Sequence, residues 1–311
     1  MKKLESMRKG FGRALAKLGE TDKNVVAACA DLTESLNMTE FAQKFPKRFF
    51  EVGIGEQNMV TFGAGLAAQG KVAFVGSYAA FCPGRCWEQI RTTICINNLP
   101  VKIVGSHAGL SVGPDGATHQ MLEDIAMMRA LPNMVVLAPC DSVEAEKMTL
   151  AMAADKRPNY MRLARNDTPI ITSDDSPFVI GQAYVFCPGT DVTIISTGVM
   201  TCLAMLAAEI LRKDGISAEV IHVPTIKPLD EATILASVHK TRAVVTVEEA
   251  QIAGGLGGAV AELLAENLPT PMRRIGVNDA FGESGTPEQL LHKHGLTPTH
   301  IALAAHQLRS L

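Results

Sequence analysis

The sequence is poor in several features that mark whole classes of protein. Its formal net charge is only -3, from 29 basic and 32 acidic residues. It therefore has no basic surplus to attract nucleic acid or an anionic membrane. No apolar run approaches the roughly 18 residues of a membrane span, and the basic, amphipathic start has no signal-peptide core behind it. We expect no nucleic-acid partner, no membrane and a cytoplasmic location.

Cysteine is sparse and irregularly spaced. The seven cysteines stand at positions 29, 82, 86, 95, 140, 187 and 202. An odd count without framework spacing predicts reduced thiols rather than disulfides. Cys82 and Cys86 are four residues apart and could face each other, but no second Cys or His pair completes a zinc site, so packing is favoured. We expect no metal ligands from this chain.

What the sequence does contain is a regular alternation of short, β-rich apolar runs with longer helical patterns. This alternation is typical of a parallel sheet covered by helices. The 311 residues allow about two domains, and a segment rich in Asp, Ser, Thr and Pro separates two blocks of the pattern. We predict an α/β protein with a doubly wound parallel sheet in residues 1–170, a linker over 171–189 and a smaller α/β domain over 190–311.

The pattern also predicts the individual elements. In the first block we expect strands at 25–30, 49–52, 72–75, 101–105, 134–138 and 159–163, and helices at 56–68, 83–97, 121–130 and 142–154. In the second block we expect strands at 192–196, 218–222, 243–247 and 272–275, and helices at 200–213, 230–238 and 256–266. Ligands of such sheets bind beyond the carboxyl ends of the strands.

A carboxylate at the start of one predicted helix is the first candidate functional group. The strand at 49–52 runs into Gly53 and Gly55, and Glu56 opens the helix. A glutamate in a first helical turn is favoured by the helix dipole and is commonly just solvated. Glu56, however, also lies beyond the carboxyl end of a strand, where a ligand would bind. We therefore treat it as a candidate site residue.

A long loop after the strand at 101–105 gathers His107, Asp115 and His119. Loops of this length that carry polar side chains are commonly functional. A metal centre is the rival interpretation, but the spacing is not that of a zinc set and no fourth ligand is evident. A second glycine-rich run, at 254–258, could bind phosphate. It lacks the third glycine of a dinucleotide motif, because Val260 follows, so helix–sheet packing is favoured there.

Five stretches resemble the transketolase family in order and spacing. They are ADLTES at 30–35, GIGEQN at 53–58, GPDGATHQ at 113–120, LARN at 163–166 and EEAQIAGGLG at 248–257. The resemblance covers essentially the whole chain. It implies a pyrimidine-type domain that binds thiamine diphosphate, followed by the family's C-terminal domain.

The family's GDG-(x)n-N motif, which holds the metal and the diphosphate, is missing from this sequence. The resemblance therefore implies the C-terminal subunit of a split, two-chain transketolase. A partner N-terminal subunit would carry that motif and bind Mg²⁺ or Ca²⁺, so that thiamine diphosphate is shared between the two chains. A homodimer contact would then give a heterotetramer.

The resemblance implies roles at the coenzyme for four residues. Glu56 would activate the aminopyrimidine ring through a hydrogen bond, Tyr78 and Phe81 would form an aromatic wall, and Asp31 would contact coenzyme or substrate across a subunit interface. The family's third aromatic position falls near Gly84, which predicts a more open pyrimidine pocket.

The resemblance also implies a substrate site for a sugar phosphate. Its members would be Arg8, Ser35, His107, Asp115, His119 and Arg165. His119 and Asp115 would contact hydroxyls near the reacting carbons, and His107 and Arg165 would hold the far end. Arginine suits phosphate because its planar fork binds two oxygens at once. For Arg8, which lies in an amphipathic stretch, the alternative to phosphate binding is a basic side chain that is simply solvated. The catalytic set would be Glu56, His107 and His119.

The implied activity is the transfer of a two-carbon ketol unit from a ketose to an aldose, both usually phosphorylated. Two alternatives lie within catalysis: a subunit like 1-deoxyxylulose-5-phosphate synthase, and a 2-oxoacid dehydrogenase β-type subunit, in which Glu56 has similar neighbours. Asp115 and His119 favour ketol transfer, although the synthase has a similar loop. A noncatalytic regulatory subunit is the alternative from another class, and retention of the candidate residues argues against it.

Overall fold

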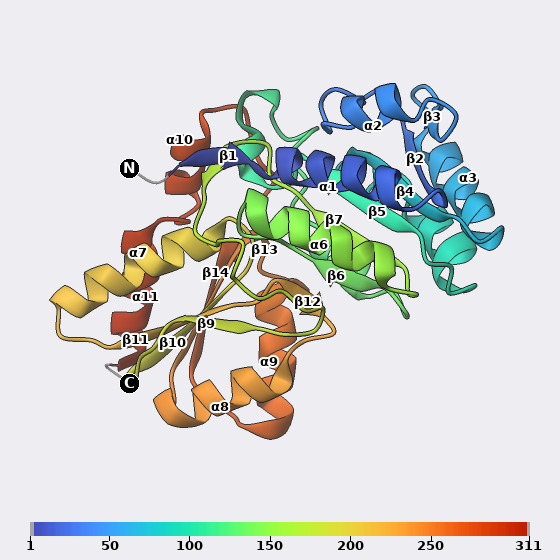
Figure 1. Ribbon diagram of the computed structural model, residues 1–311. Coiled ribbons are helices and arrows are strands. Elements are labelled where there is room, and N and C mark those ends of the chain that lie inside the picture. The colour runs from blue at the N-terminus through green and yellow to red at the C-terminus, as the bar shows by residue number, and fades with distance from the viewer. Residues whose placement is uncertain (1–2, 310–311) are drawn as a thin grey trace.

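The computed structural model describes residues 3–309, which form two α/β units lying against each other (Figure 1). Residues 1–2 and 310–311, at the outer ends of the two predicted domains, lie outside the described part. No helix in the described part is long and apolar enough to cross a membrane.

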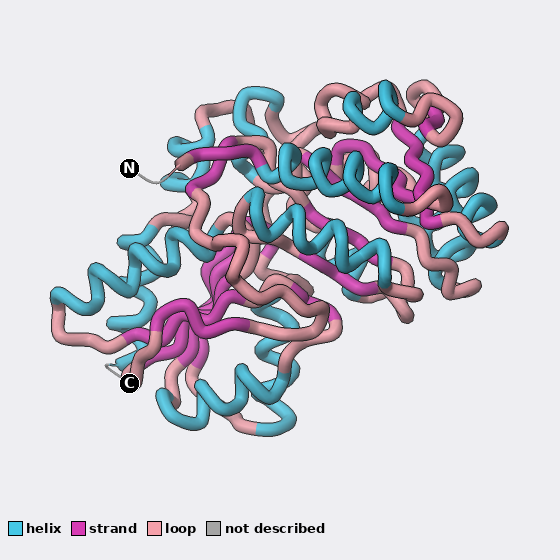
Figure 2. The backbone as a smooth tube through the Cα atoms, viewed as in Figure 1, coloured by secondary structure: helices cyan, strands magenta, loops and turns pink. Residues whose placement is uncertain are grey.

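The first unit is built on a seven-stranded sheet. Its strands, magenta in Figure 2, have helices beside them. Its strand order is β12-β6-β7-β5-β4-β2-β3, and every pairing is parallel except that of β12 with β6. The strands are β2 (Val25–Cys29), β3 (Phe49–Glu51), β4 (Val72–Tyr78), β5 (Lys102–Ser106), β6 (Val135–Leu137), β7 (Asn159–Arg162) and β12 (Thr225–Lys227).

Helices cover both faces of this sheet, because alternate strand residues point to opposite sides. One apolar cluster joins Val75 and Ile103 to α3 (Glu56–Ala68), the π-helix Ile90–Cys95 and α5 (Asp124–Arg129). On the other face Phe74 and Val104 pack with α1 (Met7–Thr21), α2 (Thr39–Lys44) and α6 (Ser142–Ala154). The predicted doubly wound α/β sheet is confirmed.

The second unit has a five-stranded sheet of order β14-β13-β10-β11-β9, in which only β9 runs antiparallel. The strands are β9 (Tyr184–Cys187), β10 (Val192–Ser196), β11 (Ala218–His222), β13 (Val244–Gln251) and β14 (Met272–Val277). The helices are α7 (Met200–Lys213), α8 (Glu231–Thr241), α9 (Leu256–Asn267), α10 (Pro287–Lys293) and α11 (Pro298–Arg309). Two apolar clusters, one on each face, form its core.

The predicted strands and helices are found within about four residues of their expected bounds. The strands expected at 72–75 and 243–247 run on to Tyr78 and Gln251, and the helix expected at 121–130 begins only at Asp124. The helix expected at 83–97 starts later, as α4 (Trp87–Gln89), and continues as the π-helix. The residues before it form turns that include the cis Cys82–Pro83 bond. Short strands were not expected, among them β9, β12 and the pair formed by β1 (Leu4–Ser6) and β8 (Asp167–Pro169).

The start of the segment expected as a linker, 171–189, is held against the first unit, whereas its end contains β9 of the second sheet. The carboxylate of Asp141 accepts the backbone N–H groups of Ile171 and Thr172 at 2.8 and 2.6 Å. Lys147 donates from Nζ to the carbonyl oxygens of residues 173, 174 and 176. A polar residue at the N-cap of α6 and a lysine on the same helix thus fix the start of the segment.

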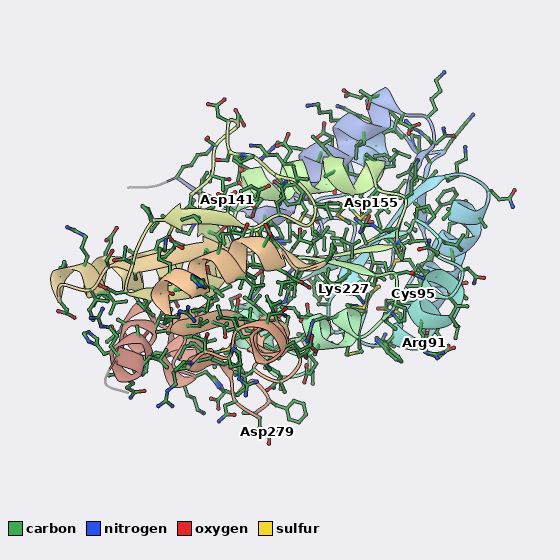
Figure 3. All side chains as sticks on the ribbon, turned by 90° about the horizontal axis from the view of Figure 1, so that it is seen from below. Arg91, Cys95, Asp141, Asp155, Lys227 and Asp279 are labelled. Carbon is green, nitrogen blue, oxygen red and sulfur yellow. The ribbon has the colours of Figure 1, made fainter. Side chains whose placement is uncertain are left out.

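The second part of the chain also contributes one strand to the first sheet. β12 follows β11 of the second sheet but pairs with β6 of the first. Lys227, the last residue of β12 and labelled in Figure 3, donates from Nζ to the carbonyl oxygens of Arg129 and Leu131. Because these contacts tie the second unit to the edge of the first sheet, they fix the position of the second unit beside the loops that follow the first sheet's strands.

Candidate functional site

Five of the predicted site residues follow the carboxyl ends of neighbouring strands. Arg165 follows β7, His107 follows β5, Tyr78 ends β4, Asp31 follows β2 and Glu56 follows β3. These strands lie in the order β7-β5-β4-β2-β3 and are all parallel. Parallel strands bring their carboxyl ends to one edge, which is where such sheets bind ligands.

Four of the predicted side chains form one cluster of rings at this edge. The Tyr78 and His107 rings stack with centroids 3.8 Å apart, and Tyr78 and Phe81 stack at 6.0 Å. His119 meets Phe81 edge-on at 5.4 Å and Tyr78 at 6.3 Å. The predicted aromatic wall and the two predicted histidines therefore belong to a single group of contacting rings, which we call the ring cluster (Tyr78, Phe81, His107 and His119).

His107 is buried as a neutral imidazole. It is 3% exposed and has a left-handed backbone, with φ of 55°. Burial, together with the nearby charges of Arg8 and Arg165, lowers the pKa of His107 to about 3. Its Nδ1 lies 2.9 Å from Ser106 Oγ. At neutral pH this side chain therefore offers hydrogen bonds without a positive charge.

This shift predicts an acid-sensitive component of stability. Because the folded-state pKa of His107 lies below the ordinary 6.5, the unfolded chain binds more protons between about pH 6.5 and pH 3, so stability falls as pH drops through that window. Between pH 6.5 and 4.5 the loss should be on the order of 2 kcal/mol. Urea unfolding of His107→Asn at both pH values should show a smaller difference than the wild type. His239→Asn, at an exposed histidine, should keep the wild-type difference, and an unchanged His107→Asn profile would contradict the assignment.

Arg8, on α1, is hydrogen-bonded to the backbone of the other predicted arginine, Arg165. Arg8 donates from Nη2 to the carbonyl oxygen of Arg165 at 2.8 Å, from Nη1 to that of Ser35 at 2.7 Å, and from Nε to Ser6 Oγ at 3.1 Å. Arg165 donates to Val112 at 2.6 Å. Arg8 is thus a clamp among three segments, and only part of its hydrogen-bonding capacity remains for a ligand.

Asp115 and Asp31 lie at the exposed side of the edge. Asp115 is 3.9 Å from Arg165 and about one third exposed. Asp31 has φ of 57°, and its backbone N–H donates to Glu51 Oε1 at 2.6 Å. Within residues 3–309 no hydrogen bond or ion pair connects the Asp31 side chain to the ring cluster. The structure thus brings Asp115 near Arg165 and leaves Asp31 beside Glu51.

Glu56 is buried at the start of α3, at 2% exposure. Its Oε2 accepts a hydrogen bond from Arg85 Nη1 at 2.8 Å. The guanidinium of Arg85 also lies over the Phe81 ring, 4.9 Å from its centroid. Arg85 was not among the residues predicted from the sequence. It is 29 positions from Glu56, and only the folded chain brings its guanidinium next to that buried carboxylate.

The position near Gly84 cannot hold an aromatic side chain. A Cβ built on Gly84 would lie 2.3 Å from the carbonyl oxygen of Ala80. Such a contact is too short for any side chain, so the turn requires glycine. Arg85, the next residue, instead contacts both Glu56 and Phe81.

The second unit supports the loop that carries the histidines. Glu249, on β13, accepts the backbone N–H of Ser111 at 2.6 Å, and burial raises the pKa of Glu249. Gly109 has φ of 90°, and a Cβ there would lie 2.5 Å from the Glu249 carboxyl carbon. Gln120 donates to the carbonyl of Glu283 at 2.9 Å. The loop conformation therefore depends on side chains and backbone from the second unit.

The glycine-rich run at 254–258 is used for packing. Glu248 accepts the N–H groups of Leu256 and Gly257 at 2.8 Å each, which occupies the N-terminus of α9. A Cβ on Gly255 would lie 2.0 Å from the same carboxylate. Burial raises the pKa of Glu248 to about 7. A protein carboxyl group thus takes the place that a phosphate would need.

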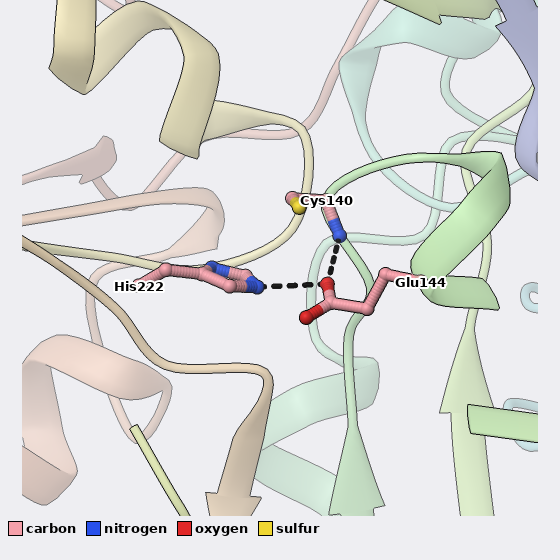
Figure 4. A group of neighbouring side chains, drawn as sticks. All are labelled: Cys140, Glu144 and His222. Atoms are coloured by element: carbon pink, nitrogen blue, oxygen red, sulfur yellow. Dashed lines mark hydrogen bonds and ion pairs between the residues drawn. The ribbon is translucent and has the colours of Figure 1, made fainter. Parts of the chain in front are cut away.

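Among the described residues, one group has the donor atoms and proximity to hold a metal ion: Cys140, Glu144 and His222, all buried (Figure 4). Glu144 Oε2 accepts the Cys140 N–H at 2.7 Å and lies 2.8 Å from His222 Nε2. The other ring nitrogen lies 2.8 Å from Thr201 Oγ1. Two ligands of a tetrahedral zinc stand farther apart, at roughly 3.3 Å, because each is about 2.0–2.2 Å from the metal. We therefore interpret the group as a hydrogen-bonded contact between the units.

Residues 5–170 match the pyrimidine-binding domain of transketolase, and residues 181–301 match the transketolase C-terminal domain. The chain is 48% identical to a putative transketolase C-terminal section of Methanocaldococcus jannaschii, over 96% of this chain and 94% of that protein. It is 42% identical to a 6-deoxy-6-sulfo-D-fructose transketolase subunit of Clostridium sp., over 97% and 94% of the two chains.

Solved structures give the same picture. A structure described as a split gene transketolase, inactive beta4 tetramer, superimposes with a TM-score of 0.93 at 42% identity, over 98% of this chain and 99% of that one. The transketolase of Campylobacter jejuni shares the fold, with a TM-score of 0.83 at 21% identity, and this chain covers 46% of it.

A sequence relative has a different name. The 1-deoxy-D-xylulose-5-phosphate synthase of Pelotomaculum thermopropionicum is 41% identical over 94% of this chain and 46% of that protein.

Proposed function

Because the chain belongs to the transketolase family, we propose that it is the C-terminal subunit of a two-chain, thiamine diphosphate-dependent transketolase. Its substrates would be a ketose phosphate, which gives up a two-carbon ketol unit, and an aldose phosphate, which receives it. The observation that carries the proposal is a buried carboxylate, Glu56, next to the ring cluster at the carboxyl edge of the sheet.

The residues at this edge fit the pyrimidine end of the coenzyme. A buried carboxylate can share a proton with a ring nitrogen, and apolar rings beside it keep water away. Glu56 Oε1 has no hydrogen-bond partner within residues 3–309, while Oε2 is paired with Arg85. Tyr78 and Phe81 supply the aromatic surface. When bound, the coenzyme would hold the electron pair of the broken carbon–carbon bond.

The arginines and histidines fit an anionic, polyhydroxylated substrate. Arg8 and Arg165 lie close together, and the neutral His107 lies near both. A neutral imidazole can bond a hydroxyl without competing for the phosphate charge, whereas Arg165 can pair with that charge. His119 and Asp115 would hold the hydroxyls near the reacting carbons. Ser35 and Asp31, on the loop after β2, would contact ligands from the other side.

A partner subunit is part of the proposal. This sequence has no GDG-(x)n-N motif, so the diphosphate and its Mg²⁺ or Ca²⁺ would bind to a separate N-terminal chain. The related proteins described as a C-terminal section, as a subunit and as a split gene product support this division. Self-association of this chain would make the complex a heterotetramer.

The deciding assay compares donors in the complex reconstituted with that N-terminal chain. With a ketose phosphate and an aldose phosphate, we expect ketol transfer and no release of carbon dioxide. With pyruvate as the donor, we expect no turnover and no release of carbon dioxide. If the complex releases carbon dioxide from pyruvate but transfers no ketol unit between sugar phosphates, the proposed transketolase activity is refuted. That result would favour the synthase alternative, which the 41% identity to a deoxyxylulose-phosphate synthase keeps open.

A further inference from the structure

Arg85 has an unusual position relative to the buried carboxylate. Glu56 is 2% exposed, whereas the Arg85 side chain is 48% exposed, and the two pair at 2.8 Å. In residues 3–309, Arg85 is the one ion-pair partner of Glu56. A buried carboxylate without a partner is costly. The half-exposed guanidinium therefore offsets the burial of Glu56 in the chain without its coenzyme.

The backbone of Arg85 is tied to the same two segments as its side chain, the first turn of α3 and the turn at Phe81. Its carbonyl oxygen accepts a hydrogen bond from Gln57 Nε2 at 3.3 Å, directly after Glu56. Its N–H donates to the carbonyl of Phe81 at 3.2 Å. Its guanidinium lies over the Phe81 ring. Arg85 thus connects the first turn of α3 with the ring cluster through both its main chain and its side chain.

We propose that Arg85 is the positioning residue of Glu56. It holds Oε2 in an ion pair, which fixes the rotation of the carboxylate and leaves Oε1 free to bond the aminopyrimidine. This inference rests on the proposed function, because it concerns the group that Glu56 is proposed to activate. The turn that contains Gly84 excludes a side chain at that position, so the ring cluster has a cation where a third aromatic ring was expected.

The planar fork of arginine is what this role requires. A guanidinium can pair with a carboxylate and lie flat on an aromatic ring at the same time, whereas an ammonium is a compact, strongly hydrated charge. Arg85→Lys should therefore keep the charge of the pair but hold the carboxylate less firmly. Arg85→Gln removes the charge altogether.

The first test uses the chain alone and needs no coenzyme. Arg85→Gln leaves Glu56 buried and unpaired, so its thermal unfolding midpoint should fall by about 3 °C. In the double variant Glu56→Gln/Arg85→Gln the buried charge is gone, and the midpoint should return to within about 1 °C of the wild type. Arg91→Gln, at a nearby exposed arginine, is the matched control. Equal midpoints for Arg85→Gln and Arg91→Gln would overturn the pairing.

The second test uses the reconstituted complex and measures the exchange of the coenzyme C2 proton with deuterium, together with the coenzyme Kd. Loss of a fixed carboxylate orientation should slow exchange about 100-fold in Arg85→Gln, with less than a tenfold change in Kd. Arg85→Lys should recover part of the rate, and Arg91→Gln should match the wild type.

The outcomes separate this inference from the proposed function. If Glu56→Gln abolishes exchange but Arg85→Gln stays within twofold of the wild type, only the positioning role is overturned. Equal losses in Arg85→Lys and Arg85→Gln, or a loss explained entirely by Kd, would also overturn it. If Glu56→Gln itself exchanges at the wild-type rate, the proposed function fails and the positioning role fails with it.

Discussion

Glu56→Gln should lower ketol transfer by the reconstituted complex by about 10³-fold, the range in which positioned proton-transfer groups act. Glutamine has nearly the shape of glutamate but cannot share a proton with a ring nitrogen. Because Glu56 is buried beside Phe81 and Arg85, solvent has little access to replace it. The measurement is initial rate at saturating coenzyme, so that a change in coenzyme affinity is not mistaken for a change in rate.

The matched control for this prediction is Glu40→Gln. Glu40 also lies in the first turn of a helix, α2, but it is exposed and pairs with Lys44 at the surface. It should retain the wild-type rate, because an exposed pair of this kind contributes little. Full activity of Glu56→Gln would refute the assigned role, and unaltered circular dichroism of both variants would rule out misfolding as the cause of any loss.

Asp124→Ala should destabilise the chain by about 3–5 kcal/mol, as expected when one partner of a buried ion pair is removed. Asp124 is 0% exposed and accepts hydrogen bonds from Arg162 Nε at 2.8 Å and from the Tyr160 hydroxyl at 2.7 Å. Without it, the Arg162 charge, only 8% exposed, loses its counter-ion. The loss can be measured by urea unfolding of the chain alone.

Two further variants test whether the loss of stability comes from the ion pair between Asp124 and Arg162. Tyr160→Phe removes one hydroxyl and should cost about 1 kcal/mol. Asp175→Ala changes an exposed aspartate and should stay within about 0.5 kcal/mol of the wild type. A loss below about 1 kcal/mol in Asp124→Ala would contradict the assignment of this pair as a buried structural contact.

Much of the fold followed from local patterns in the sequence. The strand at 192–196 and the helices at 56–68, 142–154 and 200–213 have the bounds that were expected. Buried parallel strands are continuous apolar runs, and amphipathic helices repeat every 3.6 residues, so both leave a signal in the sequence. Strands of three residues, such as β12, leave no such period, because their pairing is decided by where the second unit docks.

The site was predicted only as far as single motifs reach. The sequence pointed to Glu56 and to the loop with His107 and His119, and the fold brings the two histidines into one ring cluster. It could not reveal contacts between distant positions. Arg162 donates to the carbonyl of Glu249, 87 positions away, and Ser111 donates to the Glu249 carboxylate, 138 positions away. The contact of Arg85 with Glu56 depends on the shape of one turn, which propensity alone does not specify.

Strand β12 lies late in the sequence but belongs to the first sheet, and this limits where the polypeptide can be divided. A fragment boundary near residue 180 would separate the two blocks of the sequence pattern. However, β12 follows that boundary in the chain and pairs with β6 at the edge of the first sheet. A fragment ending at that boundary would expose the N–H and C=O groups of β6 along an open sheet edge, which is a template for aggregation. The first sheet therefore has its full set of strands only when residues 225–227 are present.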